Sequence, residues 1–292
     1  MTNDDPEVSV RIVEVGPRDG LQNEADPIST AAKIAFVDAL SRAGHSHIEV
    51  TSMVRPDRVP QLADAEKVFR GIEKTPGVRY TVLVPNERGL DRALAVGARS
   101  IAVFTAASEP FSKKNTGMTL SRSLQTIAAM AERARREEVL VRAYVSTCFV
   151  CPYSGAVAPE NVSAALRRLR DLGINAISIG DTVGAATPPE VEQLLDIVKT
   201  ESPTPDPGNP LSGLALHLHD THGRALENVH VGLERGIREF DTSAGGLGGC
   251  PFAPGAPGNL STESLLEFLD GRGLETGVNL ESQKKASVHL GE

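Results

Sequence analysis

The sequence predicts an α/β protein, a closed (β/α)8 TIM barrel with its active site at the C-terminal ends of the strands. Short β-branched segments bounded by Gly, Pro or Asn alternate with amphipathic segments along nearly the whole chain. Such alternation is typical of parallel strands joined by crossover helices. Eight of these units fit within 292 residues, which is the size of one such barrel.

The predicted strands are rich in β-branched residues and end at turn residues. In chain order they are VRIVEVG (10–16), HIEVTSM (47–53), RYTVLV (79–84), SIAVFTA (100–106), VRAYVSTCF (141–149), AISIGDT (176–182), LALHLHD (214–220) and EFDTSAG (239–245). An open doubly wound sheet is the alternative, but it usually has fewer repeats, and no GxGxxG follows the first strand.

Helical periodicity is clearest in four of the intervening segments, which are 30–44, 123–138, 159–173 and 188–201. Pro159 and Pro188 stand where a first helical turn tolerates a missing N–H. Gly173 and Gly236 follow periodic runs closely, as left-handed helix caps do. We therefore expect one barrel domain over residues 1–292 with a short C-terminal extension.

The composition excludes several classes of function. The net charge is −8, from 30 basic and 38 acidic side chains without a basic block, which argues against nucleic-acid binding. No run approaches the roughly 18 apolar residues of a membrane helix, and the N-terminus carries no recognisable targeting signal. The three cysteines, Cys148, Cys151 and Cys250, are an odd number in a large chain. We expect reduced thiols and a cytoplasmic protein.

Polar residues gather where the predicted strands end. In a barrel of this kind the loops after the strands build the active site, so these residues are the candidates for it. They are Glu14, Arg18 and Asp19 near the first strand, Glu49 and Thr51 on the second, Cys148 and Cys151 at the fifth, Asp181 on the sixth, His217, His219 and Asp220 on the seventh, and Cys250 and Asn259 after the eighth.

The spacing of two histidines predicts a metal site. Residues two apart on a strand face the same way, so His217 and His219 point together. Because a closed barrel places the first strand one strand away from the seventh, Asp19 can approach this pair across the rim. An amide oxygen from Asn259 would complete a mixed oxygen and nitrogen set. Its oxygen share and the absence of a thiolate pair favour Mg²⁺ or Mn²⁺ over Zn²⁺.

Arg18 and Asp181 each have a functional and a structural interpretation. A guanidinium at the barrel mouth is a fixed donor for a carboxylate or a developing oxyanion, and Arg18 can also form an ion pair with Glu49. Both can hold, since the pair would orient the guanidinium. Asp181 in GDTVG either holds a turn or supports the metal ligands from behind. Cys148 and Cys151 have the spacing of half a zinc knuckle, but without a second pair we interpret them as packing at the rim.

The sequence resembles the 3-hydroxy-3-methylglutaryl-CoA lyase family, one of the metal-dependent lyases and Claisen-type synthases built on this barrel. The resemblance extends from residue 10 to about 280. Its motifs are VEVGPRDGLQNE (13–24), IEVTSMV (48–54), AASEPFSKKN (106–115), VSTCFVCPYSG (145–155), SIGDTVGAATP (178–188), LHLHDTHGRALEN (216–228) and GLGGCPFAPGAPGNLSTE (246–263).

The resemblance implies cleavage of 3-hydroxy-3-methylglutaryl-CoA to acetyl-CoA and acetoacetate, a step of leucine degradation. It implies that Asp19, His217, His219 and Asn259 hold the divalent metal and that Arg18 steadies the enolate oxygen. Cys250 would be the mobile catalytic thiol, and Glu49 and Asp181 would support the site. The first general base stays open among Asp19, a histidine and the thiol, and our hypothesis is that Cys250 protonates carbon.

Three further expectations concern ligands and partners. Lys113, Lys114 and Asn115, in a loop over SEPFSKKNTG (108–117), are candidates to bind the phosphates of the acyl-CoA substrate. A homodimer is expected from the resemblance alone. No cysteine follows Cys250, so the regulation that some relatives obtain from a terminal cysteine is not expected here.

Four alternatives use the same barrel. A lyase for a longer 3-hydroxy-3-alkylglutaryl-CoA, such as isohexenylglutaryl-CoA, would share the metal site. A synthase joining acetyl-CoA to a 2-oxo acid usually opens with Leu-Arg-Asp-Gly rather than the Pro17 sequence found here. A catalytically silent acyl-CoA-binding barrel usually loses one of the site residues, and all are present. A Schiff-base aldolase needs a strand lysine, and no predicted strand contains one.

Overall fold

Eight parallel strands close into a barrel in the computed structural model, which describes residues 9–201, 206, 208–248 and 258–288. Their order around the barrel is β1-β10-β9-β8-β5-β4-β3-β2, and β2 pairs with β1. The strands are β1 Arg11–Glu14, β2 His47–Ser52, β3 Arg79–Leu83, β4 Ser100–Ala106, β5 Leu140–Ser146, β8 Ala176–Asp181, β9 Leu214–Leu218 and β10 Glu239–Thr242. The predicted fold class is confirmed.

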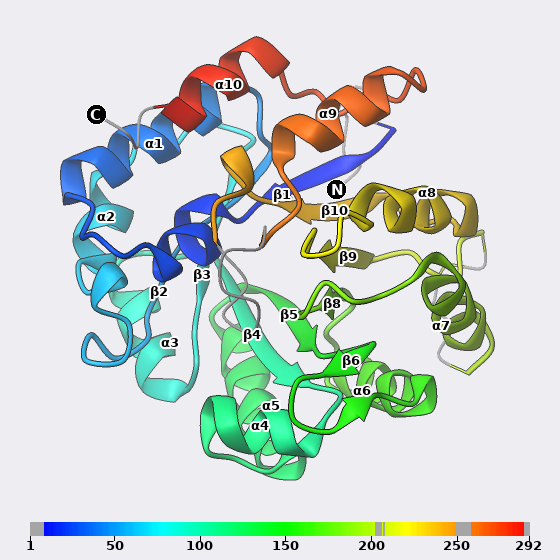
Figure 1. Cartoon of the computed structure of the whole chain (residues 1–292). Coiled ribbons are helices and arrows are strands. Elements are labelled where there is room, and N and C mark those ends of the chain that lie inside the picture. The colour runs from blue at the N-terminus through cyan, green and yellow to red at the C-terminus, as the bar shows by residue number, and fades with distance from the viewer. Residues whose placement is uncertain (1–8, 202–205, 207, 249–257, 289–292) are drawn as a thin grey trace.

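Helices surround the barrel (Figure 1). Those of the described chain are α1 Thr30–Arg42, α2 Ala65–Gly71, α3 Glu87–Ala95, α4 Glu109–Thr116, α5 Leu120–Arg136, α6 Pro159–Asp171, α7 Pro188–Glu201, α8 Ala225–Arg235, α9 Thr262–Asp270 and α10 Leu280–Val288. As predicted, α6 and α7 begin at their prolines, and α8 is capped by Gly236, whose φ is 99°. The short last helix, α10, packs against α1 and α9.

The fifth strand is shorter than predicted. It ends at Ser146 rather than at residue 149, because Thr147 adopts a φ of 55° that a strand cannot continue through. The chain then forms a small antiparallel hairpin of β6, Val150–Cys151, and β7, Gly155–Ala156. Cys148 and Cys151 therefore lie beyond β5, and both side chains are buried without forming a disulfide.

The apolar core lies between the strands and the helices, whereas the inside of the barrel carries polar groups. Phe36 of α1 and Phe69 of α2 are among the largest fully buried side chains of the outer layer. Inside, Arg142 of β5 donates to Asp241 of β10. Two strands separate β5 from β10, so this contact crosses the barrel interior. Barrel interiors are usually filled by branched apolar residues, and a charged interior is a first sign of function.

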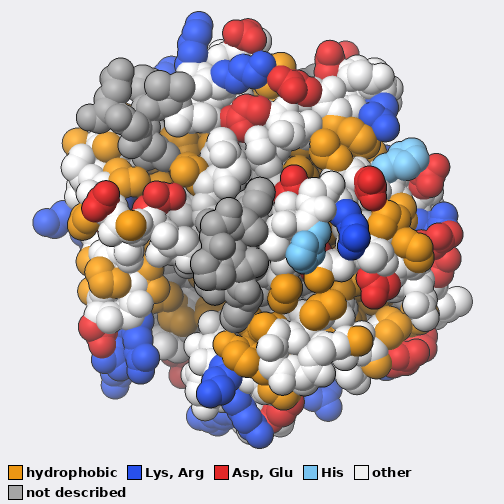
Figure 2. Space-filling view, viewed as in Figure 1, with side chains coloured by type: hydrophobic (Ala, Val, Ile, Leu, Met, Phe, Trp, Pro, Cys, Tyr) orange, Lys and Arg blue, Asp and Glu red, His pale blue; other side chains and the backbone are white. Residues whose placement is uncertain are grey.

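Charged side chains of both signs lie on the outer surface. On the face shown in Figure 2, basic and acidic side chains are intermingled over the described residues. No helix within the described residues has the length and apolar character needed to cross a bilayer.

Candidate metal centre

The turn after β1 brings Arg18 and Asp19 to the rim of the barrel. Residues Gly16–Gly20 form a single π-helical turn in which the N–H groups of Arg18, Asp19 and Gly20 all point to the carbonyl oxygen of Val15, at 3.0, 2.7 and 3.4 Å. Pro17 fits this turn because it has no N–H to satisfy. The tight turn places both charged side chains directly above the strand end.

The end of β9 presents the two histidines and recruits the segment that carries Asn259. His217 lies within the strand, and His219 follows it and forms an isolated bridge with Asn259. The neighbouring N–H of Leu260 donates to the carbonyl of Leu218 at 3.0 Å. Gly248, with a φ of 94°, lies so close that a Cβ there would be 2.8 Å from Nδ2 of Asn259. Glycine is therefore required for Asn259 to occupy this position.

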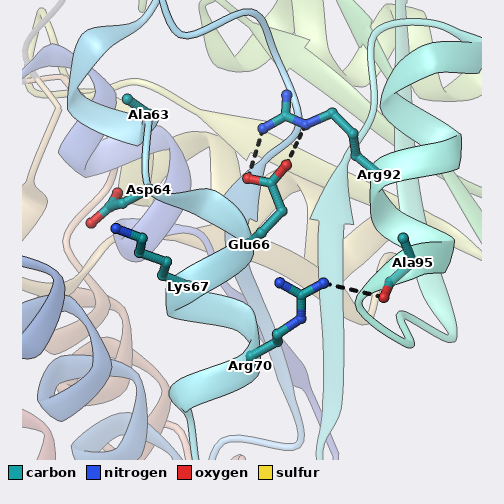
Figure 3. A pocket seen from close by; sticks show the side chains of 7 residues that line it. All are labelled: Ala63, Asp64, Glu66, Lys67, Arg70, Arg92 and Ala95. Atoms are coloured by element: carbon teal, nitrogen blue, oxygen red, sulfur yellow. Dashed lines mark hydrogen bonds and ion pairs between the residues drawn. The ribbon is translucent and has the colours of Figure 1, made fainter.

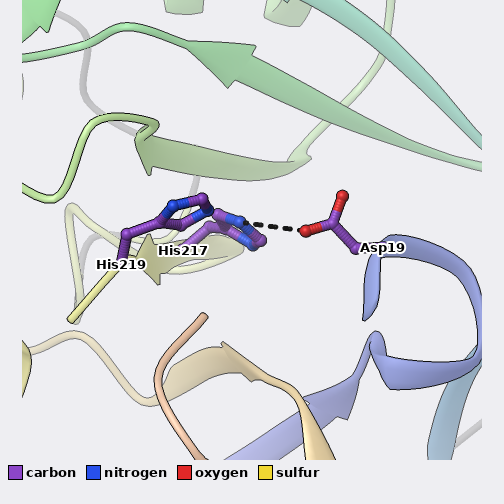
Figure 4. Close-up of side chains that lie close together, drawn as sticks. All are labelled: Asp19, His217 and His219. Carbon is purple, nitrogen blue, oxygen red and sulfur yellow. Dashed lines mark ion pairs between the residues drawn. The ribbon is translucent and has the colours of Figure 1, made fainter. Parts of the chain in front are cut away.

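These elements bring the four predicted metal ligands together. Asp19, His217 and His219 each offer one ligand atom, and the three atoms lie within 4.8 Å of one another. Figure 4 shows the carboxylate of Asp19 facing the two rings, with Nε2 of His217 3.8 Å from Oδ2 of Asp19. Nδ2 of Asn259 donates to the same Oδ2 at 2.9 Å. Asp19, His217 and His219 thus converge at the rim, and Asn259 is joined to them through its hydrogen bond to Asp19.

Electrostatics prepare this carboxylate and one of the imidazoles for a cation. Burial alone would raise the pKa of Asp19, but Arg18, the two histidines and the amide of Asn259 lower it to about 2. Burial lowers the pKa of His219 to about 4, so this ring is neutral near pH 7. Burial opposes the charge on His217 too, but its interaction with the carboxylate of Asp241 and the charge of Asp19 raise its pKa. An anionic carboxylate and neutral imidazoles are the forms in which these groups bind metals.

The residues present fit a divalent metal ion. Oδ1 of Asn259 and Nδ1 of His219 are buried and have no hydrogen-bond partner in the described structure. Buried polar atoms without partners are rare and point to an absent ligand or ion. A carboxylate, two imidazoles and an amide oxygen form a set of hard and borderline ligands that suits Mg²⁺, Mn²⁺ or Zn²⁺.

Arg18 is fixed beside this position by two carboxylates. Its Nε donates to Glu49 and its Nη1 to Asp19, and Tyr144 donates its hydroxyl to the other oxygen of Glu49 at 2.6 Å. The ion pair with Glu49 considered from the sequence is therefore present. These contacts raise the pKa of Arg18 against the cost of its burial. Two of its five N–H groups are used within the described residues, which leaves donors for a ligand.

Comparisons with known proteins agree with this geometry. The HMGL-like family model matches residues 9–288. The chain belongs to this family. A hydroxymethylglutaryl-CoA lyase from Pseudomonas mevalonii is 45% identical over 97% of this chain and 91% of its own length. The solved HMG-CoA lyase of Brucella melitensis has a TM-score of 0.92 and 46% identity, covering 97% of both chains.

A third HMGL-like relative carries ligands. The structure of an HMG-CoA lyase from Acinetobacter baumannii in complex with coenzyme A and 3-methylmalate has a TM-score of 0.88 and 35% identity, covering 97% of this chain and 92% of that one. The resemblance inferred from the sequence motifs is thus confirmed for the family and the fold.

Sequence reasoning missed one carboxylate of this HMGL-like site. Asp241 of β10 lies behind His217, with its Oδ2 3.4 Å from Nδ1 of the ring. Arg142 and His217 hold the pKa of Asp241 well below its usual range, although burial opposes this. The sequence did contain a signal for this pair, because Asp241 and Arg142 are charged residues that lie within predicted barrel strands.

Asp181 holds a turn behind the site. Its carboxylate accepts the backbone N–H groups of Gly184, Ala185 and Ala186 at 3.0–3.2 Å, which shapes the loop between β8 and α7. Burial raises its pKa to about 6. No hydrogen bond or ion pair within the described residues joins it to the metal-ligand side chains. The geometry thus supports the turn-holding interpretation, and a supporting role toward the metal stays a prediction.

The candidate phosphate-binding residues lie in a helix and not in a loop, which corrects the expectation for 108–117. Ser108 caps α4 by accepting the N–H of Phe111, and Pro110 is accommodated in the first turn. Lys113, Lys114 and Asn115 are exposed near the C-terminal end of α4, and Lys113 lies 3.2 Å from Glu109. Cys250 lies outside the described residues, so its catalytic role stays a prediction.

An open hollow on the outer helices is separate from this centre. It lies between α2 and α3 and is lined by Ala63, Asp64, Glu66, Lys67, Arg70, Arg92 and Ala95 (Figure 3). Glu66 pairs with Arg92 through two hydrogen bonds of 2.5 and 2.8 Å, and Arg70 donates to the carbonyl of Ala95. Its polar groups thus largely satisfy one another instead of converging on a ligand.

Proposed function

We propose that this chain cleaves 3-hydroxy-3-methylglutaryl-CoA to acetyl-CoA and acetoacetate. The observation that carries the proposal is the convergence of Asp19, His217 and His219 within 4.8 Å at the C-terminal rim of the barrel. The names of the relatives agree with the activity inferred from the sequence, since curated proteins of 45–46% identity over most of the chain are hydroxymethylglutaryl-CoA lyases.

Mg²⁺ or Mn²⁺, held by Asp19, His217, His219 and Asn259, is the proposed cofactor. When bound, a divalent ion polarises the C3 hydroxyl and the free carboxylate of the substrate and lowers the pKa of that hydroxyl. The short chain of contacts from Asn259 to Asp19 and from Asp19 to Arg18 fixes these groups before the substrate arrives. Such preorganisation is what makes electrostatic catalysis effective.

Arg18 is the proposed donor to the thioester oxygen. Removal of the C3 hydroxyl proton lets the C2–C3 bond break, so that C3 becomes the ketone of acetoacetate and the electron pair moves onto C2 and the thioester oxygen. Glu49 and Asp19 already hold the guanidinium in place, so that it can stabilise the negative charge that develops on this oxygen. Protonation of C2, which we assign to Cys250, gives acetyl-CoA.

The acyl-CoA substrate also needs a site for its phosphates. We propose that Lys113, Lys114 and Asn115 provide it, since α4 follows β4 on the active face and presents all three to solvent. The relative with coenzyme A bound supports an acyl-CoA ligand of this kind. The single-domain organisation, the cytoplasmic location, the place in leucine degradation and the homodimer are proposed together with this function.

The test is acetoacetate release by the purified protein. We expect release with Mg²⁺ or Mn²⁺, loss of release with EDTA, and recovery when the metal is restored. Substrates with longer 3-alkyl groups are compared by release of acetyl-CoA, the product common to all of them, and we expect the methyl substrate to be preferred. A protein that binds metal but releases no acetoacetate from the methyl substrate would refute the proposal.

A further inference from the structure

A continuous set of polar contacts runs through the barrel interior beneath the metal position. Arg142 lies over the ring of Tyr144, with its Cζ 5.0 Å from the ring centroid, and Tyr144 donates to Glu49. Glu49 holds Arg18, which in turn contacts Asp19. On the other side, Arg142 binds Asp241, which lies behind His217. The metal ligands and the oxyanion donor are therefore supported by one connected network.

Asp241 is held within this network by two side chains. Arg142 binds it through two hydrogen bonds, from Nη2 to Oδ1 at 2.7 Å and from Nη1 to Oδ2 at 3.2 Å. Ser178 donates to Oδ2 at 2.6 Å. The Asp241 side chain has no exposed surface. A buried bidentate pair with an additional hydroxyl donor leaves this carboxylate a single position.

The ring of His217 lies between two carboxylates. Nδ1 is buried and makes no hydrogen bond of good geometry within the described residues, and Oδ2 of Asp241 lies 3.4 Å from it. Nε2 lies 3.8 Å from Oδ2 of Asp19. A neutral imidazole carries one N–H and one lone pair, so the partner of one nitrogen decides which nitrogen can bind a metal. Carboxylates behind metal-binding histidines commonly make this choice.

We propose that Asp241 is a positioning residue that accepts the Nδ1–H of His217 and thereby turns Nε2, with its lone pair, toward Asp19 and the metal position. Arg142 and Ser178 keep the carboxylate in place, so that the ring is oriented before the metal binds. The inference rests on the metal site of the proposed function and adds a residue of β10 to it.

Glu239 supplies a matched control for Asp241. It lies two residues earlier on the same strand and also pairs with Arg142, at 3.0 Å, and no contact in the described structure joins it to His217. Both Asp241→Asn and Glu239→Gln remove one negative partner of Arg142. Only the first change alters the group that faces Nδ1 of His217, because it replaces the carboxylate with a neutral amide that can present an N–H to the ring.

The first measurement is Mn²⁺ binding without substrate, followed by electron paramagnetic resonance. Asp241→Asn is expected to weaken binding about 10- to 100-fold, and Glu239→Gln to leave it within about 3-fold of the wild-type value. Equal weakening in both variants, or wild-type affinity in Asp241→Asn, would overturn the proposal. If the wild-type protein binds Mn²⁺ but releases no acetoacetate, the proposed function fails while this comparison still stands.

The second measurement is the tautomer of His217 in metal-free wild-type protein, read by ¹H–¹⁵N NMR in alkaline buffer, where the ring is neutral. We expect the proton on Nδ1. A proton on Nε2 would contradict the proposal, and because no substitution is involved, this result decides it even if Asp241→Asn does not fold.

Discussion

Glu14 accepts hydrogen bonds from the loop after the first barrel strand and from the segment after the last. The substitution Glu14→Gln tests how this carboxyl makes the stability of the protein depend on pH. Its Oε1 accepts the N–H groups of Gly16 at 2.8 Å and Ala244 at 2.9 Å, and its Oε2 accepts the hydroxyl of Thr262 at 2.7 Å. The side chain is fully buried, and burial raises its pKa to about 7. Glu263 adds to this rise, while His45, 3.9 Å away, has its pKa lowered to about 4 by burial and is neutral there.

The sign and size of the effect follow from this raised pKa. Between the unfolded value of 4.5 and the folded value of about 7, the folded protein keeps a proton that the unfolded chain has released. Stability from this group is therefore fully present below about pH 4.5 and is lost as the pH rises through 7. Between pH 5 and pH 8 the loss amounts to about 2–3 kcal/mol.

Glutamine keeps the acceptor for both backbone N–H groups but cannot ionise. We expect the free energy of unfolding of Glu14→Gln, relative to wild type, to be greater at pH 8 than at pH 5 by about 2–3 kcal/mol. Urea unfolding at the two pH values measures this, and subtraction removes the titration of groups common to both proteins. Glu73→Gln, at an exposed glutamate, is the control and should show no such difference. If the free energy of unfolding of Glu14→Gln relative to wild type were the same at pH 5 and pH 8, the assignment of the pH dependence to this carboxyl would be refuted.

Three further predictions concern catalysis. Arg18→Lys should lower kcat roughly 10²- to 10³-fold in steady-state kinetics because the fixed donor fork is lost, and unchanged kcat would exclude Arg18 as the oxyanion donor. Lys114→Ala and Lys113→Ala should raise KM for the acyl-CoA substrate with kcat unchanged, whereas the control Lys67→Ala on α2 should change neither, and an unaltered KM would remove α4 from the substrate site. Cys250→Ala should slow acetoacetate release at least about 10²-fold without weakening Mn²⁺ binding, and normal turnover under saturating metal would rule out the thiol as the acid.

The candidate metal site could be predicted because its geometry follows from strand periodicity and barrel closure. His217 and His219 face one way because they are two apart, and Asp19 follows a strand that lies one strand away from theirs. The role of Asn259 was predicted mainly from the family resemblance, since no local sequence pattern shows that its segment runs beside the end of β9. The ion pair between Arg18 and Glu49 could be predicted because Arg18 follows β1 and Glu49 lies on β2, and these two strands are neighbours in the barrel.

The remaining features depend on contacts that no local pattern carries. Asp241 and Arg142 meet across the barrel interior, and the strand order alone does not give the depth at which two side chains face each other. The segment that forms α4 was predicted as a loop, although Pro110 fits a first helical turn. The early end of β5 depends on the left-handed backbone of Thr147, whose N–H donates to the hydroxyl of Thr182 on the next strand's loop.

The most direct test of the central claim is anomalous diffraction from crystals of the protein soaked with Mn²⁺. We predict one strong peak at the C-terminal rim, with Asp19, His217, His219 and Asn259 each contributing an atom at about 2.0–2.3 Å. A Mn²⁺ ion bound elsewhere, or a peak at the rim that the two histidines do not approach, would contradict the metal centre and with it the proposed lyase.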